Sequence, residues 1–187
     1  MGLGVSACAT CDGFFFKNKT VAVAGGGNTA VEEALFLSNL CKKVFIIHRR
    51  DKFRAEKILQ DRLLKKDNIE ILWNQEVKKV IGDKENRCIS GIEVFNNKNK
   101  TKTEMKIDGF FVAIGHAPAT TLFKTKIEMD DEGYIITSPD STKTNIDGVF
   151  AAGDVTDKIY RQAVTAAGMG CMSAIEAESF LNSKKII

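Results

Sequence analysis

The sequence has no long apolar run, no basic stripe and few cysteines. Apolar stretches such as Phe110–Gly115 are far shorter than the roughly 20 residues that cross a bilayer, and no signal-peptide pattern opens the chain. The net charge of +3 is small and dispersed, which argues against nucleic-acid binding. With 44% apolar and 27% charged residues, the composition is that of an ordinary globular protein without a membrane or nucleic-acid partner.

The five cysteines are too few and too scattered for a secreted disulfide scaffold. Only Cys8 and Cys11 lie close together, which predicts one functional pair in a reducing compartment, the cytoplasm. We expect Cys41 and Cys171 on apolar helix faces and Cys88 near a strand start. Buried, inert thiols are the common case at such positions.

Residues 20–48 have the pattern of one βαβ unit. The runs Thr20–Ala24 and Val44–Ile47 are typical of parallel strands buried on both faces. A helix is expected between them, because apolar residues recur at helical spacing at Ala30, Ala34, Leu37 and Cys41. Thr29 and Glu32 are spaced as a capping box at its start. A right-handed crossover then places the two strands side by side.

Shorter segments follow up to residue 116. A helix is predicted over 53–66, with four apolar residues turned inward: Ile58, Leu59, Leu63 and Leu64. Strands are predicted at Glu70–Trp73, Glu76–Val80, Ile89–Phe95, Met105–Ile107 and Phe110–Ile114. The stretch NNKNKTK at 96–102 indicates a solvated hairpin tip.

The character of the chain changes after residue 116. Residues 117–147 are rich in loop formers and hold both prolines. A strand is predicted at Gly148–Asp154 and a long amphipathic helix at 161–181. One strand and one helix can form only a small hydrophobic core. We therefore expect residues 117–187 to be only part of a domain.

The segment Gly25-x-Gly27-x-x-Ala30 follows a predicted strand and opens a predicted helix, the context of a dinucleotide fingerprint. Gly25 permits the tight turn, Gly27 lets the backbone approach a pyrophosphate, and Ala30 allows close helix packing. A purely structural turn is the alternative.

The end of the second strand indicates which dinucleotide binds. An NAD site places an acidic residue there to bind the ribose 2′-hydroxyl. This chain instead has His48, Arg49 and Arg50, followed by Arg54. Guanidinium groups suit the 2′-phosphate of NADP. A solvated basic helix start is the alternative, but cations are unfavourable at a helix N-terminus without an anion.

Cys8-Ala9-Thr10-Cys11 has the spacing of a redox-active dithiol. A zinc site would need a second pair of ligands, and the other three cysteines are isolated. Asp12, next in the chain, is a candidate proton donor to the leaving thiolate or a helix N-cap.

Five motifs in this order resemble the low-molecular-weight thioredoxin reductases. They are Cys8–Gly13 (CATCDG), Gly25–Ala30 (GGGNTA), His48–Arg54 (HRRDKFR), Gly148–Asp154 (GVFAAGD) and Tyr160–Ala163 (YRQA). The resemblance covers essentially the whole chain. It implies a Rossmann-like α/β fold, with an NADPH domain at 1–116 bearing an antiparallel insert and the C-terminal portion of an FAD domain at 117–187.

The resemblance also implies the site residues and partners. Electrons would pass from NADPH through FAD to Cys8 and Cys11, with Asp12 as the acid, and on to thioredoxin in a homodimeric enzyme. The NADPH ligands would be Gly25, Gly26, Gly27, Asn28, Thr29, Ala30, His48, Arg49, Arg50, Arg54, Ile114 and Gly115. The FAD ligands would be Gly153, Asp154, Arg161, Gln162 and Ala163. No metal site is implied.

The family carries a second glycine fingerprint, for FAD, near its N-terminus, and this sequence has no counterpart. We therefore expect the chain to be the C-terminal part of such an enzyme, with any targeting segment left open. One alternative is an NADP-binding fragment without turnover. Another is a flavoprotein reductase of a peroxiredoxin, although those usually carry Pro-His where this chain has Ala9-Thr10.

Overall fold

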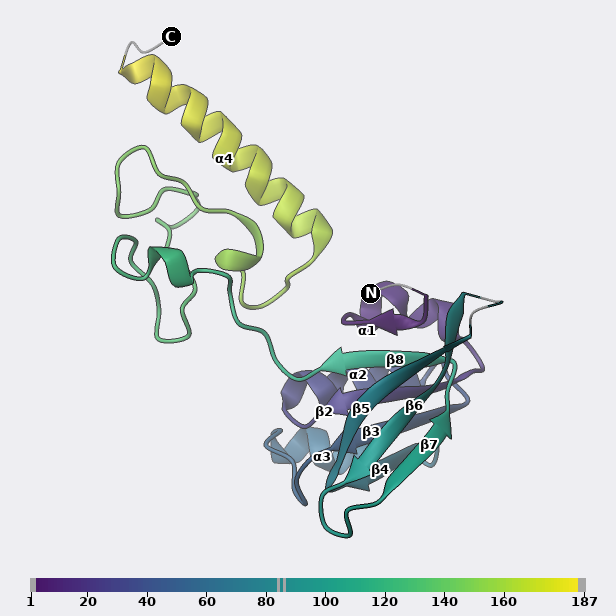
Figure 1. Cartoon of the computed structure of the whole chain (residues 1–187). Coiled ribbons are helices and arrows are strands. Elements are labelled where there is room, and N and C mark those ends of the chain that lie inside the picture. The colour runs from purple at the N-terminus through teal and green to yellow at the C-terminus, as the bar shows by residue number, and fades with distance from the viewer. Residues whose placement is uncertain (1–2, 84, 86, 185–187) are drawn as a thin grey trace. The chain divides into compact units, whose positions relative to one another are not determined.

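The chain folds into two units, Met1–Gly115 and His116–Ile187 (Figure 1). The computed structural model describes residues 3–83, 85 and 87–184. The first unit contains a parallel and an antiparallel sheet, and the described part of the second consists of loops, two 3-10 turns and one long helix. The predicted α/β class is confirmed.

A five-stranded parallel sheet forms the centre of the first unit. Its strands, in spatial order, are β1 (Val5–Ser6), β8 (Gly109–Ala113), β2 (Thr20–Gly25), β3 (Lys43–His48) and β4 (Ile69–Trp73). Val23 of β2 lies between Ile46 of β3 and Phe111 of β8. All three side chains are inaccessible to solvent, as expected for parallel strands covered on both faces.

Helices pack on one face of this sheet. They are α1 (Ala9–Asp12), the 3-10 helix η1 (Gly13–Phe16), α2 (Asn28–Ser38) and α3 (Lys57–Leu63). Ala30, Ala34 and Leu37 of α2 are completely buried, which confirms the face predicted from helical spacing. The predicted extent of α2 is wrong at its C-terminal end, because the helix ends at Ser38 and Cys41 lies beyond it, still buried in the core.

The start of α2 also differs from the prediction. Thr29 and Glu32 form no capping box, because the helix begins at Asn28 and its N-cap is Gly27, which has no side chain to bond the first N–H groups. The Asn28 side chain instead donates to Glu56 Oε1 at 3.2 Å and accepts the Glu56 N–H at 2.9 Å. This pair joins the first turn of α2 to the start of α3.

The third helix is shorter than the predicted 53–66. Leu63 is buried and Leu59 packs against the core, as residues four apart on one helix face should. Ile58 and Leu64 were expected to point inward as well, but they are 57% and 67% exposed. Ile58 lies on the other side of α3, and Leu64 is the C-cap just beyond its last residue.

An antiparallel sheet packs on the opposite face of the parallel one. It consists of β5 (Gln75–Asp83), β6 (Cys88–Asn96) and β7 (Lys102–Lys106), in that order. Ala22 and Ile47 meet Ile92 and Val94 of β6 in the core between the two sheets. Successive side chains of β2 therefore point alternately into the core under the helices and into the core between the two sheets, as the two-residue period of a strand requires. The residues between β6 and β7 form the predicted hairpin turn.

The second unit has a smaller core in its described part, formed around Ile127, Ile135 and Ala151. The predicted strand at Gly148–Asp154 is wrong. Phe150 makes only an isolated bridge to Lys143, and the segment continues into the 3-10 helix η3 (Gly153–Val155). An apolar extended segment is a strand only where a neighbour pairs along it, and the described residues contain no such neighbour.

The long C-terminal helix α4 (Ala163–Ser183) follows another 3-10 turn, η2 (Thr121–Phe123), and η3. Glu176 of α4 accepts the Thr142 N–H at 2.9 Å and the hydroxyl groups of Ser141 and Thr142 at 2.6 and 2.5 Å. These bonds hold α4 to the 138–142 loop. Within the described ranges, no helix combines the length and apolar character needed to cross a membrane.

Candidate active site

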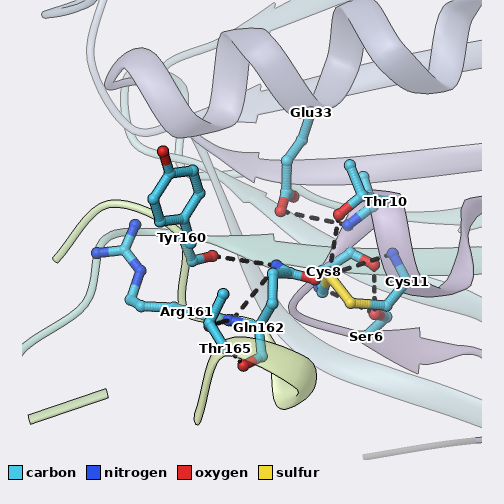
Figure 2. Close-up of a disulfide and its surroundings, with 10 residues drawn as sticks. Ser6, Cys8, Thr10, Cys11, Glu33, Tyr160, Arg161, Gln162 and Thr165 are labelled. Carbon is cyan, nitrogen blue, oxygen red and sulfur yellow. Dashed lines mark hydrogen bonds between the residues drawn. A yellow bond between two sulfur atoms is a disulfide. The ribbon is translucent and has the colours of Figure 1, made fainter. Parts of the chain in front are cut away.

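Cys8 and Cys11 form a disulfide, with their Cα atoms 5.3 Å apart (Figure 2). Cys8 is the N-cap of α1, and its Sγ atom accepts the Cys11 N–H at 3.2 Å. The Thr10 hydroxyl lies 3.3 Å from the same sulfur and must be the donor, because a disulfide sulfur carries no proton. Two donors therefore converge on Cys8 Sγ, and hydrogen bonds of this kind stabilise a thiolate once the disulfide opens.

Ser6 fixes the entry to this short helix. Its Oγ atom accepts the Cys8 N–H at 3.0 Å and donates to the Cys8 carbonyl at 3.3 Å. Ser6 lies on β1, which pairs with β8, so the disulfide is tied to the edge of the parallel sheet.

The three remaining cysteines differ in environment. Cys41 is buried, and desolvation, reinforced by the negative charge of Asp108, raises its pKa to about 11. Cys88 and Cys171 are exposed, so the expectation of buried thiols is wrong for these two. Cys88 lies at the start of a strand and Cys171 on a helix without a buried residue in its described part.

Two acidic residues adjoin the disulfide. Asp12 ends α1, and its side chain makes no capping bond to the following η1 helix, so the predicted N-cap is not observed; its role as proton donor stays a prediction. Glu33 of α2 was not predicted. Its Oε1 atom accepts the Ala9 N–H at 3.3 Å. Its position within the apolar stripe of Ala30, Ala34 and Leu37 was the signal available in the sequence.

The glycine-rich loop between β2 and α2 is shaped by close contacts. A Cβ atom at Gly25 would lie 2.6 Å from Ala30 Cβ and would also overlap the Ala113 carbonyl. A Cβ atom at Gly26 would overlap the imidazole of His48, whereas one at Gly27 would meet no atom within 4 Å. The first two glycines are required by the protein's own packing. Gly27 instead borders open space in front of the uncapped N-terminus of α2.

The basic residues at the C-terminal end of β3 and just after it divide into two kinds. Arg49, Arg50 and Arg54 are exposed. His48 is buried, and its Nε2 atom lies 3.0 Å from the Lys52 carbonyl oxygen. Its ring also packs near Trp73, with centroids 5.9 Å apart.

Burial is the main influence on the pKa of His48 and lowers it. The Lys52 and Gly25 carbonyl groups act in the opposite direction, and the charges of Arg50 and Arg54 add to the lowering. The ring therefore favours the neutral state beneath the glycine loop. The predicted contact between His48 and a 2′-phosphate stays a prediction.

A cavity of about 590 Å³ brings these segments together. It is lined by predicted site residues from three parts of the chain, namely Gly25, Gly26, His48, Arg49, Arg54 and Ile114. Residues 75–80 of β5 also line it and were not predicted, and apolar residues of the parallel sheet complete the lining: Ala24, Ile47, Phe110 and Val112. Gly27, Asn28, Thr29, Ala30, Arg50 and Gly115 belong to the same loops without lining the cavity itself.

The β5 residues bring their own ion pair to the cavity. Lys78 Nζ lies 2.6 Å from Glu76 Oε2, and Asn97 donates to Glu76 Oε1 at 2.8 Å. These two hydrogen bonds are the main reason that the pKa of Glu76 lies below its ordinary value. Lys78 is thereby partly neutralised at the mouth of the cavity.

The predicted flavin residues lie in the second unit. Gly153 is buried with φ of +77°, a conformation that favours glycine, and Asp154 beside it is exposed. Arg161 and Gln162 precede α4, which begins at Ala163. Gln162 forms a capping box with Thr165.

Asp157 organises this segment and was not predicted. Its Oδ1 atom accepts the N–H groups of Ile159 and Tyr160 at 3.0 and 2.8 Å, and its Oδ2 atom accepts that of Arg161 at 2.9 Å. Burial opposes ionisation of Asp157, but these N–H groups and the Thr165 hydroxyl outweigh it, so the pKa lies below its ordinary value. Arg161 is held at a φ of +49°.

The structure places a glycine loop at the carboxyl end of one parallel strand and arginines at the end of the next. The disulfide segment is bonded to the intervening helix through Ala9 and Glu33. This combination is typical of the nucleotide-dependent disulfide oxidoreductases. The chain belongs to the pyridine nucleotide-disulphide oxidoreductase family, whose model matches residues 1–170.

Relatives and solved structures agree with this assignment. A thioredoxin reductase of Rickettsia conorii is 59% identical over 181 residues, covering 97% of this chain and 58% of the relative. Thioredoxin reductase 2 of Arabidopsis thaliana is 51% identical over 95% of this chain and 47% of its own length. The crystal structure of thioredoxin reductase from Streptococcus pyogenes matches with a TM-score of 0.88 and 41% identity, covering 97% of this chain and 58% of that one. The resemblance inferred from the motifs is confirmed, and the chain spans about half to three-fifths of these relatives.

Proposed function

We propose that this chain carries the NADPH-binding and dithiol-bearing part of a thioredoxin-disulfide reductase. Electrons from NADPH would pass through FAD to the Cys8–Cys11 disulfide and on to thioredoxin. The observation that carries the proposal is that one unit holds both the Cys8–Cys11 disulfide and the arginine-lined cavity. The cavity borders the glycine loop at Gly25 and Gly26, and the disulfide segment is bonded to α2 through the Ala9 N–H and Glu33.

The residues of the first unit fit NADPH. Gly27 faces open space, and the first N–H groups of α2 have no side-chain cap, which is the arrangement that binds a pyrophosphate at a helix N-terminus. Arg49 and Arg54 line the cavity and are exposed, so both guanidinium groups are available to a 2′-phosphate.

The residues of the second unit fit one side of a flavin site. Asp154 is an exposed carboxylate that can accept hydroxyl hydrogen bonds from a ribityl chain. Asp157 accepts the Arg161 N–H and the hydroxyl of Thr165, which in turn accepts the Gln162 N–H. When bound, FAD supplies the step that converts a hydride into two electrons for a disulfide. We propose that residues 117–187 belong to the flavin domain. The family resemblance also predicts a homodimer for the complete enzyme, and the cysteine usage predicts a cytoplasmic location.

The chain's own part in the reaction follows from the disulfide. Two electrons break the S–S bond, one proton makes one sulfur a thiol, and the other sulfur remains a thiolate. The Cys11 N–H and the Thr10 hydroxyl stabilise the charge on Cys8 Sγ. A thiolate then attacks the disulfide of thioredoxin, and the second cysteine resolves the mixed disulfide.

Binding and acceptor assays test the proposal. The purified chain should bind NADPH more tightly than NADH, and its disulfide should open in a dithiol buffer and re-form on addition of oxidised thioredoxin. Equal binding of both nucleotides, or a disulfide that does not exchange with thioredoxin, would contradict the proposal. Ala9-Thr10 between the cysteines favours thioredoxin over the peroxiredoxin system, and parallel assays with both acceptors separate the two.

A further inference from the structure

Glu33 reaches from α2 to the backbone between the two redox cysteines. Figure 2 shows its carboxyl group pointing toward the segment next to Cys8, where Oε1 accepts the Ala9 N–H at 3.3 Å. The Oε2 atom is buried and has no hydrogen-bond partner among the described residues. No other side-chain oxygen or nitrogen in the described part of the chain shares that condition.

A buried carboxylate oxygen without a partner is unfavourable, and protonation relieves it. Burial raises the pKa of Glu33, and the single Ala9 N–H opposes this only in part. The group can therefore change its protonation state when the charge of its surroundings changes.

Several ionisable groups lie on α2 or on the elements in contact with it. Among them, only the Cys8–Cys11 segment changes its charge with oxidation state. Cys8, Cys11 and Asp12 lie at α1, and Glu32 lies on α2 itself. The further elements in contact with α2 carry Lys43, His48, Lys57, Asp61 and Arg62. Only the cysteines gain a negative charge on reduction.

We propose that Glu33 is a positioning residue that couples proton uptake to reduction of the Cys8–Cys11 disulfide. A dithiol or the proposed NADPH–flavin pathway supplies two electrons, which break the S–S bond. One proton forms a thiol, the other sulfur stays a thiolate, and Glu33 takes up a second proton. Reoxidation by a disulfide acceptor returns that proton to solvent.

The position of the thiolate explains why Glu33 responds to it. The two hydrogen-bond donors to sulfur both converge on Cys8 Sγ, which favours the negative charge at that atom. Glu33 bonds the residue directly after Cys8. A charged carboxylate bonded to the residue next to a thiolate repels it, so each raises the pKa of the other. This inference rests on the proposed function, because reduction of the disulfide is the step it modifies.

The test measures the pH dependence of thiol alkylation in the reduced chain. Cys88→Ser and Cys171→Ser remove the two exposed thiols, and Cys41 is protected by burial. Iodoacetamide alkylation of the Cys8–Cys11 pair is then followed by mass spectrometry in this background and in Glu33→Gln, Glu33→Asp and Glu32→Gln. Glu32 is exposed on the same helix and serves as the matched control.

Glu33→Gln keeps an acceptor for the Ala9 N–H but carries no charge. We expect the lower thiol pKa of its cysteine pair to fall, so that alkylation near pH 6 is roughly three- to tenfold faster. The inflection contributed by Glu33 should disappear from its profile. Glu33→Asp should restore a coupled profile, and Glu32→Gln should match the parent. Superposed profiles for Glu33→Gln and the parent would overturn the inference, as would an equal shift in Glu32→Gln. A disulfide that cannot be opened and re-formed in dithiol buffer would overturn the proposed function instead.

Discussion

The imidazole ring of His48 occupies the space that a side chain at Gly26 would need. The glycine loop therefore rests on a residue from the neighbouring strand, and Arg54 N–H binds the Gly26 carbonyl at 2.8 Å. The two loops that line the cavity are thus joined by packing and by a backbone hydrogen bond.

Gly26→Ala and Gly27→Ala should separate packing from nucleotide binding. Gly26→Ala places a methyl group against the His48 ring and should lower the free energy of unfolding by about 1–3 kcal/mol. Gly27→Ala adds a methyl group to open space in extended backbone, so its stability should stay within about 0.5 kcal/mol of the parent. Urea unfolding measures both.

The two variants should differ in NADPH affinity in the opposite order from stability, with Gly27→Ala the more affected. Gly27→Ala should weaken NADPH binding about tenfold or more, because the methyl group fills the space proposed for the pyrophosphate. If Gly27→Ala binds NADPH as tightly as the parent, Gly27 does not lie at the nucleotide site. Unchanged stability in Gly26→Ala would show that His48 moves aside easily.

Replacing Arg49 and Arg50 together by alanine should discriminate between nucleotides. Each charged hydrogen bond lost to a 2′-phosphate should weaken NADPH binding by about 1.5–3 kcal/mol, while NADH binding should hardly change. Titration calorimetry with both nucleotides gives the comparison. Lys98→Ala, in the exposed β6–β7 turn, is the control for a general loss of positive charge. Equal losses of NADPH and NADH binding would argue against a contact between these arginines and the 2′-phosphate.

Several features were predictable because they depend on local pattern. The β2 strand, the glycine loop, α2 and β3 follow from two apolar runs and one helical stripe. The prediction of a strand at Gly148–Asp154 is wrong because a strand forms only by pairing with a neighbouring strand. The apolar pattern of a single segment does not show whether such a neighbour is present. Residues 75–80 reach the cavity only because the antiparallel sheet folds over the parallel one.

The missed acidic residues have a common cause. Glu33 and Asp157 matter through burial and through the backbone N–H groups that surround them. For Asp157 neither the residue type nor the spacing indicates such an environment, and for Glu33 the one signal is its position within the apolar stripe of α2. The location of the exposed arginines, by contrast, was predictable, because the residues that select the nucleotide lie at a known point of the βαβ unit. Their contact with a 2′-phosphate stays a prediction.

His48 should make the stability of the first unit depend on pH. Its folded-state pKa lies below the ordinary value of 6.5, so the unfolded chain binds a proton more readily. The stabilisation is therefore present above about pH 6.5 and is lost as the pH falls through the folded-state pKa. Urea unfolding from pH 8 to pH 5 should show a steeper fall for the parent than for His48→Gln, and parallel curves would contradict a neutral buried ring.

Asp157→Asn should loosen the segment that leads into α4. The substituted amide keeps the shape of the side chain, but it loses the charge and one acceptor oxygen that serve three N–H groups. The free energy of unfolding should fall by about 1–3 kcal/mol at pH 7. Asp131→Asn, exposed in the same unit, should have little effect.

The effect of Asp157→Asn should also disappear in acid. The folded-state pKa of Asp157 lies below its ordinary value of 3.8, so its contribution is present above that value and is lost as the pH falls through the folded-state pKa. The difference between parent and variant, measured by urea unfolding at pH 7 and again near pH 3, should shrink at the lower pH. A difference that is constant across this range would assign the effect to side-chain shape, since only the charged hydrogen bonds depend on ionisation of Asp157.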